Sequence, residues 1–137
     1  MDLIFFDLDG TLLNESSVIS PFTKETLGLL KEKNIAYTVA TGRTMLSAKT
    51  ILQGHDFDLP QIYTNGVTIW NPLNSQLTLE NLLTSDEIAT VVDAALSQGI
   101  TPFVHAIDQS NHFIFHAPSQ HRVERDLIDK HYAGTEA

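Results

Sequence analysis

The start of the chain limits its possible folds more than any other stretch. Four consecutive apolar residues, Leu3 to Phe6, predict a short strand that is buried on both faces within a parallel sheet. Asp7 and Asp9 follow where this strand should end. Because side chains alternate along an extended backbone, both carboxylates can face the same side, and Gly10 then lets the chain turn sharply. Paired carboxylates at the carboxyl end of a buried strand lie where open α/β sheets bind ligands, so this stretch predicts a site.

A helix and a second strand follow. Ser20 and Pro21 suit the N-cap and the first position of a helix, and Asn34 can end it. Residues 35–40 are mainly apolar and predict a second buried strand. Strand, helix and strand form a βαβ unit, whose strands run parallel with a right-handed crossover. The first part of the chain is therefore expected to be an α/β fold.

The second predicted strand ends in a sequence suited to an anion. Thr41, Gly42 and Arg43 follow the strand, and a new helix is predicted from about Thr44 until Gly54. Backbone N–H groups and the positive end of a helix dipole favour a phosphate at such a turn. An ordinary strand-to-helix turn has the same pattern. The two aspartates are expected one strand away, and their proximity favours the phosphate site.

Residues 61–82 are expected to complete the first domain. Residues 61–64 predict a third short strand, and residues 67–79 predict a hairpin. Asn65 and Gly66 lie between the two.

The pattern changes after residue 82. Thr84 and Glu87 have the spacing of a capping box, and apolar residues at helical spacing after them predict a helix whose apolar stripe is core. Two antiparallel strands, 100–107 and 112–116, and a last helix, 120–132, should follow. Helix, hairpin and helix form an α+β grouping, unlike the alternating first half. We therefore expect two domains, residues 1–82 and 83–137.

Composition excludes several classes of partner. The chain has 8 Lys and Arg against 17 Asp and Glu, a formal charge of −9, so neither nucleic acid nor an anionic membrane is an expected partner. The first apolar run is too short for a signal peptide, and no stretch approaches the roughly 18 apolar residues of a membrane span. With no cysteine, the chain fits a cytoplasmic location. Its 6 histidines are expected to be exposed or hydrogen-bonded, because the convergent ligand set of a zinc site is not evident.

Three motifs together carry a family resemblance. Asp7-Leu8-Asp9-Gly10-Thr11-Leu12 resembles the first signature of the haloacid dehalogenase-like hydrolase superfamily in its phosphatase form. Ala40-Thr41-Gly42-Arg43 resembles the second signature, in the form typical of the Cof-type sugar-phosphate phosphatases. Asn65-Gly66 before a hairpin resembles the beginning of the cap of that subfamily. The resemblance implies an incomplete doubly wound, Rossmann-like parallel sheet as the core, with part of an inserted α/β cap.

The resemblance also implies a mechanism. Asp7 would be the nucleophile that forms an aspartyl-phosphate, and Asp9 would be the general acid and base. Thr41, Gly42 and Arg43 would bind the phosphoryl group. Mg²⁺ would be held by Asp7 and by the backbone carbonyl of Asp9. The implied function is Mg²⁺-dependent hydrolysis of small phosphate monoesters, either sugar or nucleotide phosphates.

Two parts of the family pattern have no counterpart in this sequence. These are the Lys or Arg of the third signature and the acidic Gly-Asp run of the fourth, both of which follow the cap. We therefore expect the N-terminal portion of a longer phosphatase, with little activity alone. The first strand would then lack one neighbour, and its open edge predicts self-association. Two alternatives stay open: a phosphotransferase like the phosphomannomutases, and a non-catalytic binding or regulatory module.

Overall fold

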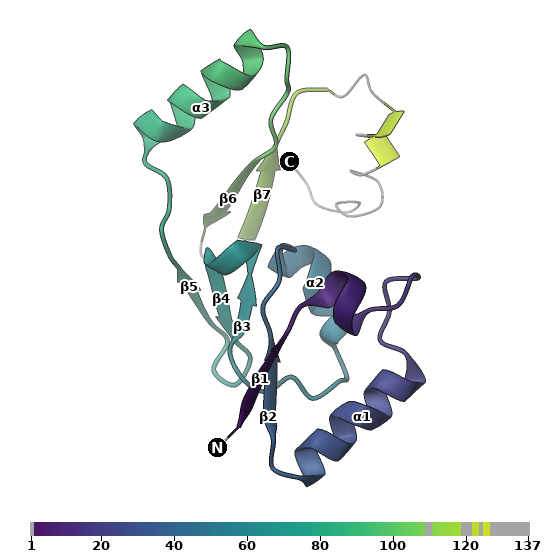
Figure 1. Ribbon diagram of the computed structural model, residues 1–137. Coiled ribbons are helices and arrows are strands. Elements are labelled where there is room, and N and C mark those ends of the chain that lie inside the picture. Colours follow the sequence, from purple (N-terminus) through teal and green to yellow (C-terminus); the bar gives the residue numbers. More distant parts are fainter. Residues whose placement is uncertain (1, 109–110, 119–121, 124, 127–137) are drawn as a thin grey trace. The chain divides into compact units, whose positions relative to one another are not determined.

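The computed structural model describes residues 2–108, 111–118, 122–123 and 125–126. The chain divides into two compact units, Met1–Asn81 and Leu82–Ala137 (Figure 1). The last helix predicted from the sequence, residues 120–132, falls largely outside the described residues.

The first unit begins with the expected βαβ arrangement. Strands β1 (Leu3–Phe6) and β2 (Ala36–Val39) pair in parallel and are joined by helix α1 (Pro21–Glu32). The hydroxyl of Ser20 caps α1 by accepting from the N–H of Thr23 at 3.1 Å. Asn34 ends the helix with a φ of 56°. The parallel α/β prediction is therefore confirmed.

The chain then forms a second, three-stranded sheet, whose first strand lies beside the end of β2. Helix α2 (Met45–Leu52) is capped by Thr44 and leads to strand β3 (Gln61–Tyr63). A parallel bridge between Ala40 and Ile62 brings β3 beside the end of β2. Strand β3 also pairs in antiparallel with β4 (Thr68–Asn71), which pairs with β5 (Gln76–Leu79).

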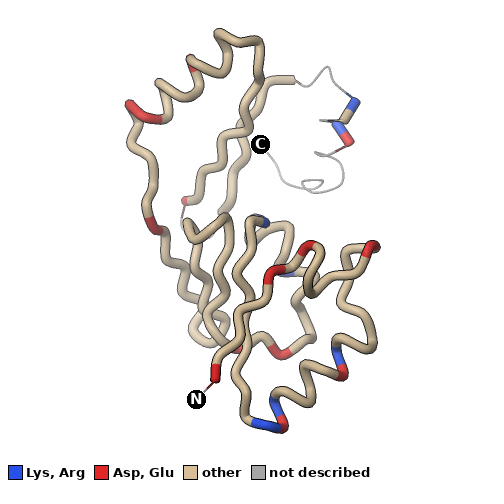
Figure 2. Tube along the Cα trace, viewed as in Figure 1, with Lys and Arg blue, Asp and Glu red and all other residues tan. Residues whose placement is uncertain are grey.

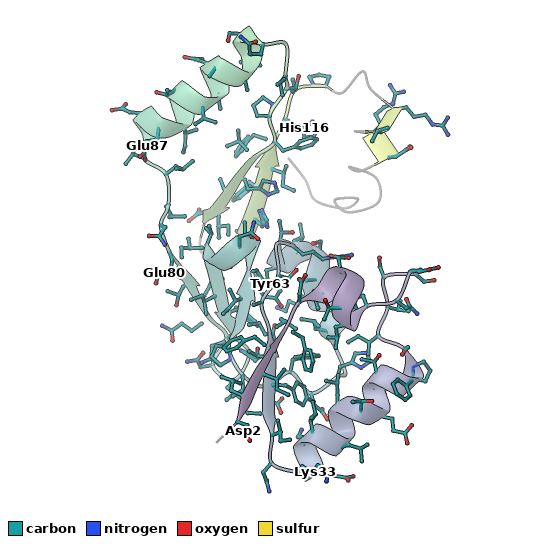
Figure 3. All side chains as sticks on the ribbon, viewed as in Figure 1. Asp2, Lys33, Tyr63, Glu80, Glu87 and His116 are labelled. Atoms are coloured by element: carbon teal, nitrogen blue, oxygen red, sulfur yellow. The ribbon has the colours of Figure 1, made fainter. Side chains whose placement is uncertain are left out.

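The hydrophobic core of this unit lies on one side of β1 and β2. Both helices contribute to it, since α1 supplies Leu27 and α2 supplies Ala48 and Leu52. Tyr63 is fully buried within the packed side chains (Figure 3). Its hydroxyl donates to Gln61 Oε1 at 2.5 Å, and burial raises the pKa of the phenol.

The opposite side of β1 is open, which corrects the prediction of a strand buried on both faces. Leu3 is 47% exposed and Phe5 is 53% exposed, whereas Ile4 and Phe6 pack against the core. Helices α1 and α2 both contribute to the core that Ile4 and Phe6 contact. Side chains alternate along the strand, so every second apolar residue meets solvent.

The second unit contains helix α3 (Ser85–Ser97) and a hairpin of strands β6 (Val104–Asp108) and β7 (Asn111–Phe115). The predicted capping box is present between Thr84 and Glu87. Strand β6 begins at Val104, later than predicted, because Pro102 has no N–H to donate to a sheet ladder.

The prediction that the apolar stripe of α3 is core is wrong. The helix has no buried residue, and Val91 is 57% exposed. No described element covers this stripe. The remaining side chains of α3 are polar or small, with acidic residues and no Lys or Arg (Figure 2).

Among the helices that the structure describes, none is long and apolar enough to cross a membrane.

Candidate active site

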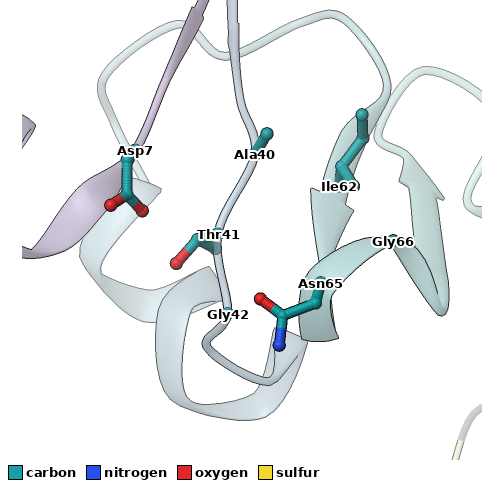
Figure 4. Close-up of a pocket in the computed structure, with 7 residues that line it drawn as sticks. All are labelled: Asp7, Ala40, Thr41, Gly42, Ile62, Asn65 and Gly66. Atoms are coloured by element: carbon teal, nitrogen blue, oxygen red, sulfur yellow. The ribbon is translucent and has the colours of Figure 1, made fainter.

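A cavity of about 480 Å³ opens where the carboxyl ends of β1, β2 and β3 meet (Figure 4). This is the edge of an open α/β sheet at which ligands bind. The lining residues are Asp7, Ala40, Thr41, Gly42, Ile62, Asn65 and Gly66. Five of the seven residues predicted as site residues are therefore in this cavity, and Asp9 and Arg43 are not among the residues that line it.

Asp7 is presented by a tight turn directly after β1. Its Oδ1 accepts from the N–H of Leu8 at 2.8 Å, and the turn is closed by the N–H of Leu13, which donates to the carbonyl of Leu8 at 2.9 Å. Gly10 has a φ of 74°, a conformation that glycine adopts without strain. The second carboxylate oxygen of Asp7 accepts no hydrogen bond from the described residues. It is therefore available to a ligand or to an electrophile in the cavity.

Thr41 has a buried hydroxyl whose proton is free to be donated in the described part of the chain. The residue is 5% exposed, and its Oγ1 accepts from the N–H of Arg43 at 3.1 Å. Its backbone N–H donates to the carbonyl of Ile62 at 3.0 Å, which fixes the turn against β3. Within the described part of the chain the hydroxyl proton has no acceptor. A buried donor without a partner costs free energy, and an anion in the cavity would supply the missing acceptor.

Asn65 and Gly42 lie side by side in the lining of the cavity. Figure 4 shows the carboxamide of Asn65 directed at Gly42. A Cβ atom built on Gly42 would lie 3.0 Å from Asn65 Oδ1, so any larger residue at this position would require the Asn65 side chain to shift. Asn65 has a φ of 53°, and its N–H donates to the carbonyl of Thr41 at 3.2 Å. The loops after β2 and β3 thus form one wall.

Arg43 and Asp9 form an ion pair that the sequence did not reveal. Arg43 Nε donates to Asp9 Oδ2 and Nη2 donates to Asp9 Oδ1, both at 2.6 Å. The Arg43 side chain is 14% exposed, that of Asp9 is 56% exposed, and Nη2 also lies 3.4 Å from Ser17 Oγ. Hydrogen bonding to the carboxylate raises the pKa of Arg43. The guanidinium expected to contact a phosphate is therefore held by Asp9.

The oxygen atoms at this site suit a hard divalent cation. Mg²⁺ prefers oxygen ligands and is commonly held by one or two carboxylates together with substrate phosphates. The unpaired carboxylate oxygen of Asp7 fits that requirement. Both carboxylate oxygens of Asp9 accept from Arg43, and the backbone carbonyl of Asp9 is a further candidate ligand. No cluster of three His, Cys, Asp or Glu residues occurs in the described ranges.

The histidines of the second unit lie on its hairpin. His105 Nδ1 and His112 Nε2 are 3.0 Å apart, and His116 Nδ1 lies 2.9 Å from the carbonyl oxygen of Ala117. These three histidines agree with the prediction of exposed or hydrogen-bonded side chains, whereas the buried Nδ1 of His55 has no hydrogen-bond partner among the described residues.

A sequence model of the haloacid dehalogenase-like hydrolases matches residues 4–134. The chain belongs to this family. The matched range includes every residue that lines the cavity.

The relatives of this haloacid dehalogenase-like chain include named phosphatases. It is 36% identical over 100 residues to 5-amino-6-(5-phospho-D-ribitylamino)uracil phosphatase YwtE of Bacillus subtilis, across 73% of this chain and 34% of the relative. It is 39% identical over 67 residues to an HMP-PP phosphatase of Shigella flexneri, across 49% of this chain and 25% of the relative. A solved haloacid dehalogenase-like hydrolase from Bacteroides thetaiotaomicron shares the fold, with a TM-score of 0.70 at 22% identity over 95% of this chain and 49% of that chain. The chain thus spans about a third of the length of the first curated relative and a quarter of the second.

Proposed function

We propose that this chain carries the phosphate half-site of a Mg²⁺-dependent phosphatase, which hydrolyses small phosphate monoesters through an aspartyl-phosphate. The observation that carries the proposal is the meeting of two unpaired groups in one cavity. Among the described residues, one carboxylate oxygen of Asp7 has no hydrogen-bond partner, and the buried hydroxyl proton of Thr41 has no acceptor. A nucleophile and a hydrogen-bond donor to an anion, placed together at the carboxyl edge of a sheet, are the minimal parts of a phosphoryl-transfer site.

In the proposed reaction, the free carboxylate oxygen of Asp7 attacks phosphorus. A bond forms between Asp7 and phosphorus while the ester P–O bond breaks, and Asp9 gives a proton to the leaving oxygen. Asp9 then takes a proton from the water that hydrolyses the aspartyl-phosphate. The Thr41 hydroxyl and the Gly42 N–H hold the phosphoryl oxygens throughout, because donors fixed in advance stabilise the charge that develops there.

Mg²⁺ would be held by the Asp7 carboxylate and the Asp9 backbone carbonyl. When bound, it neutralises charge between the carboxylate and the phosphoryl group. This is needed because two aspartates and a phosphate dianion would otherwise repel each other.

The proposed substrate is a small phosphorylated metabolite in the cytoplasm. YwtE and the HMP-PP phosphatase are named for small phosphorylated compounds, and a chain with a formal charge of −9 is poorly suited to nucleic acid. We assign residues 1–82 to the core domain and 83–137 to part of the cap, with Asn65 and Gly66 at the entry to the cap. In this assignment the cap closes over the substrate and selects it.

We also propose that this chain self-associates through β1. Among the described residues, β1 pairs with β2 alone, and it exposes Leu3 and Phe5 on one face. An open strand edge that also carries apolar side chains is a template for pairing with a second chain.

Covalent trapping tests the proposed nucleophile. The chain is incubated with Mg²⁺ and acetyl phosphate, and its peptides are analysed by mass spectrometry. Trapping requires only the first chemical step, so it succeeds even where hydrolysis of the intermediate is slow. We expect a phosphoryl group on the peptide that contains Asp7 and none in the Asp7→Asn variant, with Asp58→Asn as the control for the loss of an exposed carboxylate. Equal labelling of the Asp7→Asn variant, or an unlabelled wild-type chain, would refute the proposed nucleophile.

A further inference from the structure

The turn after β3 is held in a strained backbone conformation. Thr64, Asn65 and Gly66 have φ angles of 51°, 53° and 95°, and the left-handed region is an outlier for a β-branched threonine. The N–H of Thr64 donates to the carbonyl of Arg43 at 2.9 Å, and the N–H of Asn65 donates to the carbonyl of Thr41 at 3.2 Å. These bonds tie the turn to the loop after β2. Strain that the surrounding structure maintains is typical of functional sites, and the side chain that this turn brings to the cavity is that of Asn65.

The carboxamide of Asn65 is not used to stabilise its own turn. The side chains of Asn14, Asn71 and Asn74 each accept from a backbone N–H two residues later, which is the usual structural role of asparagine in a turn. Within the described part of the chain the Asn65 carboxamide makes no such bond, although it lines the cavity and is exposed. Its two N–H donors and its oxygen acceptor are therefore available to a ligand.

The order of the strands determines which part of a substrate Asn65 can contact. Strand β1 pairs with β2, and a bridge joins the end of β2 to β3. Neighbouring strands lie about 4.8 Å apart, so the ends of β1 and β3 are about 10 Å apart. A phosphoryl group attacked by Asp7 and held by Thr41 and Gly42 lies over the ends of β1 and β2. Asn65, at the end of β3, therefore meets the atoms beyond the phosphoryl group, which belong to the alcohol part of the ester.

We propose that Asn65 is a specificity-determining residue, whose carboxamide binds a hydroxyl on the alcohol part of the phosphate ester. A hydroxyl both donates and accepts, and a carboxamide offers both partners. An ester without a hydroxyl near the phosphate leaves the carboxamide to water and gains nothing from it. The proposal rests on the proposed phosphatase function. It narrows the substrate class to phosphate esters of hydroxyl-rich alcohols, such as polyol and sugar phosphates.

Two esters with the same carbon chain test this role in the presence of Mg²⁺. Glycerol 3-phosphate carries hydroxyls next to its ester group, and n-propyl phosphate carries none. In isothermal titration calorimetry we expect the wild-type chain to bind glycerol 3-phosphate roughly 2- to 12-fold more tightly, the value of one net hydrogen bond. Asn65→Gly removes the carboxamide and tolerates the positive φ, so it should bind the two esters equally. Asn34→Gly is the matched control, because Asn34 has a φ of 56° at the end of α1, and it should keep the wild-type preference.

The ratio of the two affinities within each variant cancels any change in the contacts to the phosphoryl group itself. The side-chain NH₂ signals of Asn65 in ¹⁵N–¹H NMR spectra give a second readout on the wild-type chain, and they should move further with glycerol 3-phosphate than with n-propyl phosphate. Equal affinities of the wild type for the two esters, or a preference that persists in Asn65→Gly, would overturn the proposal.

Inorganic phosphate separates this proposal from the proposed function. A wild-type chain that binds inorganic phosphate but does not prefer glycerol 3-phosphate would refute the role of Asn65 and leave the phosphate site in place. A wild-type chain that binds neither inorganic phosphate nor the two esters would refute the proposed function, and the role of Asn65 with it.

Discussion

Replacing Thr41 by valine removes one hydroxyl from the cavity and changes little else in shape. Two losses follow from the structure. The N–H of Arg43 loses its acceptor at 3.1 Å, which should lower the free energy of unfolding by roughly 0.5–1.5 kcal/mol. A bound phosphate loses a hydrogen bond from a neutral donor to a charged acceptor, worth roughly 1.5–3 kcal/mol, or about 10- to 150-fold in the dissociation constant.

Two matched variants separate these effects. Thr38 lies earlier in β2, is 2% exposed, and its hydroxyl donates to the carbonyl of Pro60 at 2.7 Å. Thr38→Val should therefore lower stability at least as much as Thr41→Val does, yet leave phosphate affinity unchanged. Thr41→Ser keeps the hydroxyl and should retain most of the affinity.

Isothermal titration calorimetry with inorganic phosphate and Mg²⁺ measures affinity, and urea denaturation of the same samples measures stability. The reasoning predicts that affinity falls in Thr41→Val only, while stability falls in both valine variants. It is refuted if Thr41→Val binds phosphate as tightly as the wild type, or if Thr38→Val loses affinity to the same extent.

Three further predictions concern the scaffold and its surface. Burial lowers the pKa values of His105 and His112, so the unfolded hairpin binds more protons than the folded one as the pH falls below about 6.5. The folded hairpin should therefore have its full stability above a pH of about 6.5 and lose stability as the pH falls through the lowered pKa values. Hydrogen-exchange protection of the hairpin at about pH 8 and about pH 5 checks this, and protection that is the same at both would contradict it. Leu27→Ala should lower the free energy of unfolding, measured by urea denaturation, by about 2–5 kcal/mol, because Leu27 is 3% exposed. Leu29 is 49% exposed, and Leu29→Ala should lower it by less than about 1 kcal/mol. Equal losses in the two variants would contradict the place of Leu27 in the core. Phe5→Lys should weaken self-association in analytical ultracentrifugation by at least about tenfold, whereas a wild-type chain that is already monodisperse and monomeric would rule out association through β1.

The elements that the sequence predicted well have local causes. Ser20, Thr44 and Thr84 each cap a helix through a hydrogen bond to a residue three positions later, and such contacts are determined by neighbouring residues. The meeting of the loops after β1 and β2 at the cavity was predicted for a related reason, since the carboxyl ends of parallel strands meet at one edge of a sheet. Motifs at the ends of those strands therefore had to lie together.

The features that the sequence did not predict depend on the surroundings of each element. The apolar residues of β1 and α3 have the spacing of buried residues, but burial requires a second surface, and no described element covers Phe5 or Val91. The pairing of Arg43 with Asp9 joins residues 34 positions apart. The opposite charges at the ends of neighbouring parallel strands indicated that Arg43 and Asp9 lie close together. They did not indicate whether Arg43 binds Asp9 or a phosphate.

The central claim is that Asp7, Thr41 and Gly42 form a phosphate site. Mapping backbone amide shifts during a titration of the chain with inorganic phosphate and Mg²⁺ tests it most directly. The account predicts saturable shifts at these residues and at Asn65, with none in α3. Shifts confined to other parts of the chain, or no shifts at millimolar phosphate, would contradict it.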